Sequence, residues 1–152
     1  MKLKNVCTRD VACCHSQSSI FEAARKMREH HVGNLVVVED DGDDCNALPV
    51  GIITDRDIVV EVVSRNRDPQ ETTVATVMST PMVVADESED VAEAVERMQV
   101  HGVRRIVITG AHGALAGIFT LDDLLRLTAE QAAAPLAVMT KEQKREHRDR
   151  RG

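Results

Sequence analysis

Apolar residues recur at intervals of three and four positions in two stretches of the chain, and this spacing predicts two amphipathic helices. The first stretch follows Ser19 and has apolar residues at positions 20, 23, 24 and 27, and the second follows Asp90 and has them at 91, 94, 95 and 98. Glu22 and Glu93 each stand three residues after these polar residues, which is the spacing of a capping box. Each helix is therefore expected to bury one apolar stripe.

Short uninterrupted apolar runs predict the strands. Two strands are expected after each amphipathic helix and one short strand before it, at 11–14, 35–38 and 50–53 in the first half and at 82–85, 106–109 and 115–119 in the second. A further helix is expected after Thr54 and after Thr120. The acidic segment EDDGDDCNALP is expected to be a hairpin connection, because it lacks the ligand spacing of a calcium-binding loop.

The order strand, helix, strand, strand, helix occurs twice because the chain contains an internal duplication. A shift of 71 residues superimposes the amphipathic helices, and a shift of 66 superimposes the last strands. One half of roughly 60 residues would bury too little apolar surface to be stable alone. We therefore expect a mixed α/β (α+β) fold in which motifs at 5–66 and 74–130 pack by pseudo-twofold symmetry into one module with two clefts, followed by a charged extension at 131–152.

The junction between the last strand and the last helix carries the same motif in both halves. It reads Gly-apolar-apolar-Thr-x-x-Asp, with Thr54 and Asp57 in the first copy and Thr120 and Asp123 in the second. A helix start favours an anionic ligand, and a carboxylate there can accept hydrogen bonds from a ribose diol. The alternative is a plain capping box, but the recurrence of the motif in both copies favours a ligand site.

The repeated element order, the Glu-Ala-x-x-x-Met helices and the two Thr-x-x-Asp junctions together resemble a tandem pair of CBS motifs, the unit called a Bateman module. The resemblance covers about residues 5–130. It implies a non-enzymatic regulatory module that binds AMP, ADP, ATP, NAD or S-adenosylmethionine as a regulatory ligand, with no obligatory cofactor. In the family the Asp binds the ribose hydroxyls and the Thr lies by the ribose and phosphate, which implicates Thr54, Asp57, Thr120 and Asp123.

The resemblance also implies phosphate contacts from Arg104 and Arg105, which stand just before the middle strand of the second copy. The planar donors of arginine suit phosphate oxygens. Surface salt bridges are the alternative role for both residues. The first copy has Gly33 and Asn34 at these positions, so any phosphate contact is expected to be asymmetric.

Family positions that line the adenine correspond to Ala12, Val32, Val83 and Val103, although all four could equally be plain core residues. The sequence departs from the family pattern because its middle strands lack Leu-Pro-Val. In addition, the second copy has Leu121 where the first has a polar residue. The two sites therefore need not bind the same ligand.

Composition narrows the class of partner. The formal net charge is −6, and Phe21 and Phe119 are the only aromatic residues, which disfavours a nucleic-acid surface. The basic segment 141–152 is expected to be a frayed helix or a disordered extension rather than a nucleic-acid arm. No run reaches the roughly 18 apolar residues of a membrane span, and the N-terminus lacks the apolar core of a secretion signal. We therefore expect a cytoplasmic protein.

Cys7, Cys13, Cys14 and Cys45 are expected to be reduced in that compartment and to serve as small buried hydrophobes. Adjacent side chains on a strand face opposite ways, so the cluster Cys13-Cys14-His15 does not predict a metal site. A redox-responsive switch at the cysteines remains an alternative function.

Histidines 30, 31 and 101 are expected at helix C-termini, and no nucleophile with a matching base accompanies them, so no enzyme activity is predicted. The expected mechanism is that a nucleotide bridges the two motifs and changes their orientation or a dimer surface. The expected partners are a second copy of the chain and a separate protein target. The remaining alternative is a structural dimerisation module whose clefts stay empty.

Overall fold

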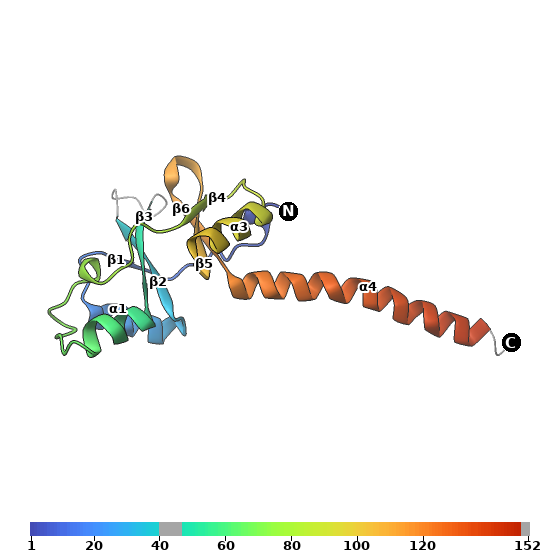
Figure 1. The fold of residues 1–152 in the computed structure, drawn as a ribbon, viewed down its shortest axis with the longest axis horizontal. Coiled ribbons are helices and arrows are strands. Elements are labelled where there is room, and N and C mark those ends of the chain that lie inside the picture. The colour runs from blue at the N-terminus through green and yellow to red at the C-terminus, as the bar shows by residue number, and fades with distance from the viewer. Residues whose placement is uncertain (40–46, 150–152) are drawn as a thin grey trace. The chain divides into compact units, whose positions relative to one another are not determined.

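Each half of the chain forms a three-stranded sheet, as Figure 1 shows in this computed structural model, which describes residues 1–39 and 47–149. In the first sheet β1 (Cys13–His15) runs parallel to β2 (Asn34–Glu39), which pairs antiparallel with β3 (Leu48–Thr54). The second sheet repeats the order with β4 (Val84–Asp86), β5 (Arg105–Thr109) and β6 (Leu115–Thr120). The predicted α/β (α+β) fold and the duplicated element order are confirmed.

The short first strands begin later than the apolar runs suggested. Strands were expected at 11–14 and 82–85, but pairing with the middle strands starts at Cys13 and at Val84. The residues just before them contribute single hydrogen bonds, because the carbonyl oxygens of Ala12 and Val83 accept the N–H groups of Val36 and Val107 at 3.1 and 3.0 Å. The predicted hairpin connection includes residues 40–46, which lie outside the described residues.

The two amphipathic helices, α1 (Ile20–His30) and α3 (Val91–His101), begin at the predicted caps. The Glu22 carboxylate accepts the N–H of Ser19 at 2.9 Å, and the Glu93 carboxylate accepts the N–H of Asp90 at 3.1 Å. Each helix ends in a left-handed residue, His31 in α1 and Gly102 in α3, a conformation that closes many helices. The predicted placement of histidines at both C-termini is therefore correct.

The helix after Thr54 is short and changes its hydrogen bonding. It starts as α2 (Asp55–Ile58) and continues as a π-helical turn over Val59–Val63, which the sequence pattern did not predict. The N–H of Ser64 donates to the carbonyl oxygen of Val59 at 2.9 Å, which is the five-residue spacing of a π-helix.

The segments at the start of the two motifs cross over to the opposite motif. We call residues 1–9 the first strap and residues 72–79 the second strap. Isolated bridges join Lys2 to Asp90 and Thr8 to Ile118, and equivalent bridges join Thr73 to Ser19 and Ser79 to Ile52. The two pairs of bridges are related by the same shifts of 71 and 66 residues that relate the motifs. The exchange therefore follows the pseudo-twofold symmetry of the duplication.

The glycine of each Gly-apolar-apolar-Thr junction allows a strap to lie against the sheet. A Cβ atom at Gly117 would lie 2.8 Å from the carbonyl oxygen of Thr8 in the first strap. At Gly51 it would lie 2.8 Å from the sulfur of Met78 and 3.2 Å from the carbonyl oxygen of Ser79 in the second strap. Both glycines are thus required by close packing.

The two sheets share a buried apolar cluster, which explains why the halves fold together. Residues of both sheets form it, namely Val36, Val38, Ile52, Val107 and Ile118. A second cluster lies beneath α1 in the first half and includes Ile20, Met27, Leu35 and Ile53. Burial of these aliphatic side chains contributes about 1.5–3 kcal/mol each.

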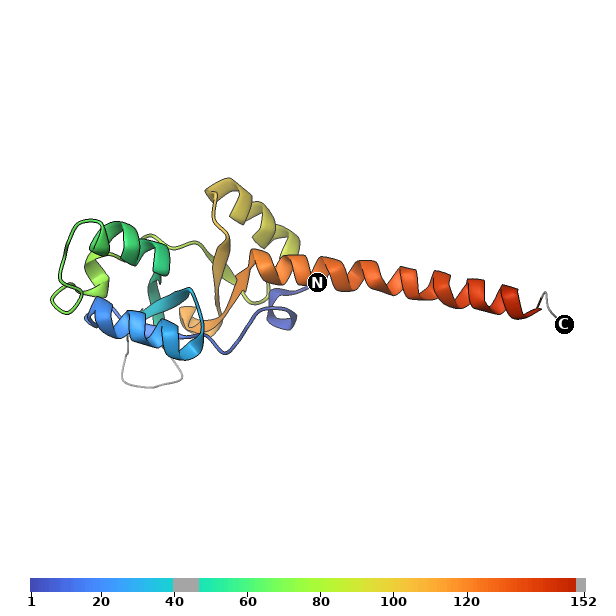
Figure 2. The ribbon, with the colours of Figure 1, turned by 90° about the horizontal axis from the view of Figure 1, so that it is seen from below.

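The chain divides into two compact units, residues 1–119 and residues 120–152. The second unit is α4 (Leu121–Asp149), which Figure 2 shows as one continuous helix. It includes Pro135, and the predicted charged extension is helical as far as Asp149. No helix in the part of the chain that the structure describes is both long and apolar enough to span a membrane.

Candidate functional site

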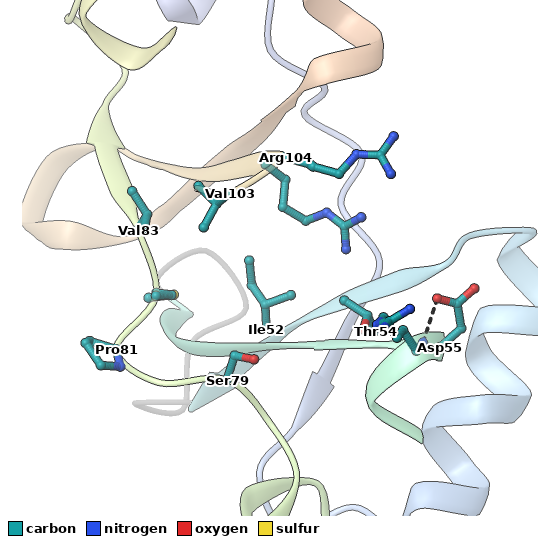
Figure 3. A pocket seen from close by; sticks show the side chains of 11 residues that line it. Ile52, Thr54, Asp55, Ser79, Pro81, Val83, Val103 and Arg104 are labelled. Carbon is teal, nitrogen blue, oxygen red and sulfur yellow. Dashed lines mark hydrogen bonds between the residues drawn. The ribbon is translucent and has the colours of Figure 1, made fainter. Parts of the chain in front are cut away.

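A cavity of about 390 Å³ lies within the first unit, between walls that come from both motifs (Figure 3). Its volume falls within the roughly 300–1,000 Å³ of ligand pockets in proteins. The first motif contributes the end of β3 and the start of α2, and the second contributes the residues before β4 and β5. The lining residues are Ile52, Thr54, Asp55, Arg56, Ser79, Pro81, Met82, Val83, Val103, Arg104 and Arg105.

Thr54 is the last residue of β3 and the N-cap of α2, which places its side chain at the cavity wall. Its hydroxyl oxygen accepts the N–H of Asp57 at 3.1 Å, and the Asp57 carboxylate accepts the N–H of Thr54 at 2.9 Å. The two residues thus form the reciprocal capping box that the motif allows. Asp57 is held by these hydrogen bonds to Thr54 and is not itself a lining residue of the cavity.

Asp55 is fixed beside the cavity by the backbone around it. Its N–H donates to the carbonyl oxygen of Gly33 at 3.0 Å, and its carboxylate accepts the N–H of Arg56 at 2.8 Å, as the dashed line in Figure 3 marks. A Cβ atom at Gly33 would lie 3.1 Å from the second carboxylate oxygen of Asp55. A glycine at position 33 therefore leaves room for this carboxylate.

Three arginines reach the cavity: Arg56 from the first motif and Arg104 and Arg105 from the second. Figure 3 shows Arg104 on the wall opposite Thr54 and Asp55. Among the described residues, none of the three guanidinium groups forms an ion pair or a hydrogen bond, so the salt bridges considered for Arg104 and Arg105 are not present. Other arginines do pair with carboxylates, as Arg97 does with Glu89 at 2.6 Å.

The four apolar candidates separate into two pairs. Val83 and Val103 line the cavity, and Figure 3 shows them together on the wall that the second motif provides. Ala12 and Val32 instead pack against the buried cluster beneath α1 and do not line this cavity. The pairing of Val83 with Val103 supplies an aliphatic surface on which a flat ring could lie.

The aspartate of the second Thr-x-x-Asp junction accepts more hydrogen bonds than the aspartate of the first. The Asp123 carboxylate accepts the N–H of Thr120 at 2.9 Å, its hydroxyl at 2.8 Å, and a guanidinium N–H of Arg126 at 3.1 Å. The position equivalent to Arg126 in the first copy is Val60, which cannot form such a bond. The two copies of the motif therefore differ in how much of their hydrogen-bonding capacity is free.

The cysteines of β1 lie in surroundings that disfavour the thiolate. Burial raises the pKa of the Cys14 thiol to about 11, and burial also raises the pKa of the Cys13 thiol. Cys14 is buried and the neighbouring His15 is exposed, as expected for adjacent strand residues. Cys45 lies outside the described residues. Within the described ranges, no group of three or more His, Cys, Asp or Glu side chains is placed to hold a metal ion.

Sequence reasoning missed two groups of residues as parts of the site. From the first motif it missed Ile52, Asp55 and Arg56, and from the end of the second strap and the residues after it Ser79, Pro81 and Met82. A signal for Arg56 existed, because it is a basic residue inside the Thr-x-x-Asp motif and lies in the first turn of the helix expected after Thr54. No sequence pattern marked Ser79, Pro81 and Met82 as site residues, because the bridge between Ser79 and Ile52 that brings this segment to β3 joins positions far apart in the sequence.

Comparison with known proteins adds independent evidence. A chain of Methanopyrus kandleri, an uncharacterized protein, is 38% identical over 122 residues, which are 80% of this chain and 60% of that one. The crystal structure of Hypoxic Response Protein I with two coordinated zinc ions is 30% identical, with a TM-score of 0.69, and the match covers 83% of this chain and 98% of that chain. A CBS domain pair in complex with 5′-methylthioadenosine and S-adenosyl-L-methionine is 25% identical, with a TM-score of 0.73 and coverage of 86% and 98%.

The family model for the CBS domain matches twice, at residues 3–64 and 74–130, which are the two halves of the duplication. These matches span most of the sequence and coincide with the two sheets described above. The chain therefore belongs to the CBS domain family.

Proposed function

We propose that this chain is a regulatory, non-catalytic module that binds an adenosine-containing nucleotide in the cavity between its two motifs. The observation that carries the proposal is the composition of the cavity wall, where aliphatic side chains, a hydroxyl at a helix start and guanidinium groups with no ion pair to any described residue line one space. The related CBS domain pair that was solved with 5′-methylthioadenosine and S-adenosyl-L-methionine supports an adenosine ligand.

The parts of the wall match the parts of a nucleotide. Val83 and Val103, together with Ile52, provide an apolar surface for the adenine. The Thr54 hydroxyl accepts a hydrogen bond from Asp57 and keeps its own proton for a ribose or phosphate oxygen. The guanidinium groups of Arg104 and its neighbours suit the phosphate. Each region of the ligand thus has a chemically suitable partner.

Asp57, which is hydrogen-bonded to Thr54, is proposed to accept a hydrogen bond from the ribose. Its carboxylate already fixes the N–H of Thr54, so the hydroxyl of that residue is held at the wall. In the proposed complex the remaining acceptor capacity of Asp57 is used by a ribose hydroxyl, a charge-assisted bond that contributes about 1.5–3 kcal/mol. The equivalent Asp123 already accepts three hydrogen bonds and is expected to contribute less.

Ligand binding is proposed to regulate by favouring one relative orientation of the two motifs. The cavity wall is built from both motifs, so a bound nucleotide contacts both and stabilises the arrangement that fits it best. The altered surface would be read by a second copy of the chain or by a separate protein. Sedimentation with and without AMP tests this step independently of binding.

A redox switch at the first strand is disfavoured by the same structure. The thiolate is the reactive form of cysteine, and burial raises the pKa of both Cys13 and Cys14. Neither thiol is therefore poised for oxidation at neutral pH.

Calorimetric titration with AMP, ADP, ATP, NAD and S-adenosylmethionine tests the proposal. We expect at least one of these compounds to bind, and Asp57→Asn to weaken its binding roughly tenfold, since one charge-assisted hydrogen bond is lost. The asparagine oxygen can still accept the N–H of Thr54, so the helix cap is retained. The matched control is Asp122→Asn, an exposed residue of α4 outside the cavity. Absence of heat with every compound would refute the proposal.

A further inference from the structure

The charge of the cavity wall is opposite to the charge of the protein. The chain carries a formal net charge of −6, yet the charged residues that line the cavity are three arginines and one aspartate. This is an excess of two positive charges at one place. Since like charges repel, such a cluster is unfavourable in the unliganded protein unless counterions or a ligand neutralise it.

The one carboxylate of the wall does little to neutralise the arginines. Asp55 accepts the backbone N–H of Arg56, and its carboxylate lies against the backbone at Gly33. It forms no ion pair with Arg56, Arg104 or Arg105 within the described part of the chain. The donors of these three side chains are therefore available to a ligand.

We propose that this cavity selects among adenosine compounds by charge, binding those with a 5′-phosphate and discriminating against S-adenosylmethionine. The inference rests on the proposed function and names the ligand class for the same cavity. Arg56 contacts the phosphate from the first motif, and Arg104 and Arg105 contact it from the second. The phosphate thereby links the two walls of the cavity.

The discrimination follows from the group attached to the 5′ carbon of the ribose. A phosphate brings negative charge and several acceptor oxygens that guanidinium groups bind with paired hydrogen bonds. S-adenosylmethionine instead carries a positive sulfonium directly on the 5′ carbon, and its ammonium and carboxylate groups cancel, so the net charge of +1 is repelled by the same guanidinium groups. The thioether of 5′-methylthioadenosine is neutral and offers neither attraction nor repulsion. The expected order of affinity is AMP first, 5′-methylthioadenosine second and S-adenosylmethionine last.

The test compares these three compounds by calorimetry on the full-length protein at two salt concentrations. We expect AMP to bind at least tenfold more tightly than S-adenosylmethionine, as a difference of one charge-assisted hydrogen bond or more implies. Added salt should weaken AMP binding and leave 5′-methylthioadenosine binding unchanged. If S-adenosylmethionine binds as tightly as AMP, the charge selection is refuted while the adenosine site stands. If none of the three binds, and ADP, ATP and NAD give no heat either, the proposed function itself is refuted.

Variants of the exposed arginines separate the phosphate contact from the rest of the site. Arg56→Gln and Arg104→Gln should each weaken AMP binding roughly tenfold and leave 5′-methylthioadenosine binding unchanged. Arg104→Glu should reverse the preference and improve S-adenosylmethionine binding. The matched control is Arg25→Gln, because Arg25 is exposed on α1, pairs with Glu29 and does not line the cavity. Equal losses for AMP and 5′-methylthioadenosine would overturn the proposal, since they would indicate a structural effect. Circular dichroism verifies that each variant is folded.

Discussion

The replacement of Gly117 by alanine is expected to loosen the first strap and to destabilise the whole protein. Gly117 lies in β6, where an added Cβ atom would be 2.8 Å from the carbonyl oxygen of Thr8 and 2.9 Å from the sulfur of Cys7. The N–H of Thr8 and the N–H of Ile118 exchange hydrogen bonds with each other's carbonyl oxygens at 2.9 Å, so the backbone of the strap cannot retreat without loss of both bonds.

The size of the effect follows from two opposing contributions. Overpacking of a well-packed region costs about 1–3 kcal/mol, and a contact with a backbone atom lies toward the upper end of that range. Alanine also stabilises by about 0.4–1 kcal/mol, because it restricts the unfolded chain more than glycine does. We therefore expect Gly117→Ala to lower the free energy of unfolding by about 1–2 kcal/mol, which corresponds to a fall in melting temperature of roughly 2–8 °C.

Two other glycines serve as internal comparisons. Gly51→Ala meets the flexible side chain of Met78 first, at 2.8 Å, and the carbonyl oxygen of Ser79 only at 3.2 Å, so its effect should be smaller. At Gly110 the nearest atom to an added Cβ is 3.4 Å away, which is ordinary contact, so Gly110→Ala should leave stability unchanged or slightly higher. Urea unfolding followed by circular dichroism measures all three. A Gly117→Ala protein as stable as Gly110→Ala would refute the account of the straps.

Two further predictions concern titratable groups. Burial raises the pKa of the Cys14 thiol to about 11, so the stability that the neutral thiol contributes is complete below its unfolded pKa of about 9 and is lost as the pH rises toward 11. Cys14→Ala should therefore reduce the fall in the free energy of unfolding between these pH values. An unchanged dependence of the free energy of unfolding on pH would contradict this prediction. The hydrogen bond from Lys2 has the larger effect and that from the N-terminal amine the smaller, and together they lower the pKa of the Asp90 carboxyl from its usual 3.8. The stabilisation of the fold by the ionised carboxylate is therefore present above pH 3.8 and is lost as the pH falls through the lowered pKa. Asp90→Asn and Lys2→Met should therefore lower the free energy of unfolding at pH values above 3.8, where the pair is intact, and should do so non-additively in a double-mutant cycle, whereas additive effects would show that the pair does not interact.

The duplicated fold could be predicted from the sequence because its signals are local. The apolar stripe of α1 and its capping box at Ser19 span a few turns of helix, and the same signals recur in α3. The exchange of straps could not be predicted in this way. Lys2 and Asp90 meet although they are 88 positions apart in the sequence, and residues 1–9 have no periodic pattern that would indicate a partner. Only the three-dimensional arrangement shows which sheet each strap crosses.

The cavity illustrates a different limit of sequence reasoning. Arg56 stands between Asp55 and Asp57, and a sequence with one arginine between two aspartates suggests local charge neutralisation. In the structure both carboxylates are instead occupied by N–H groups at the helix start: Asp55 accepts from Arg56, and Asp57 accepts from Thr54. A carboxylate that caps a helix forms short hydrogen bonds to the backbone, and its position is fixed by them.

That local arrangement determines the character of the cavity. Because the two carboxylates accept N–H groups at the helix start, the Arg56 side chain has no anionic partner among the described residues, and it lines the same cavity as Arg104 and Arg105. In the proposed nucleotide site, the capping box of the Thr-x-x-Asp motif is therefore compatible with ligand binding. The cap holds the aspartates and the Thr54 hydroxyl in place, and in doing so it leaves positive charge unpaired where a phosphate can neutralise it.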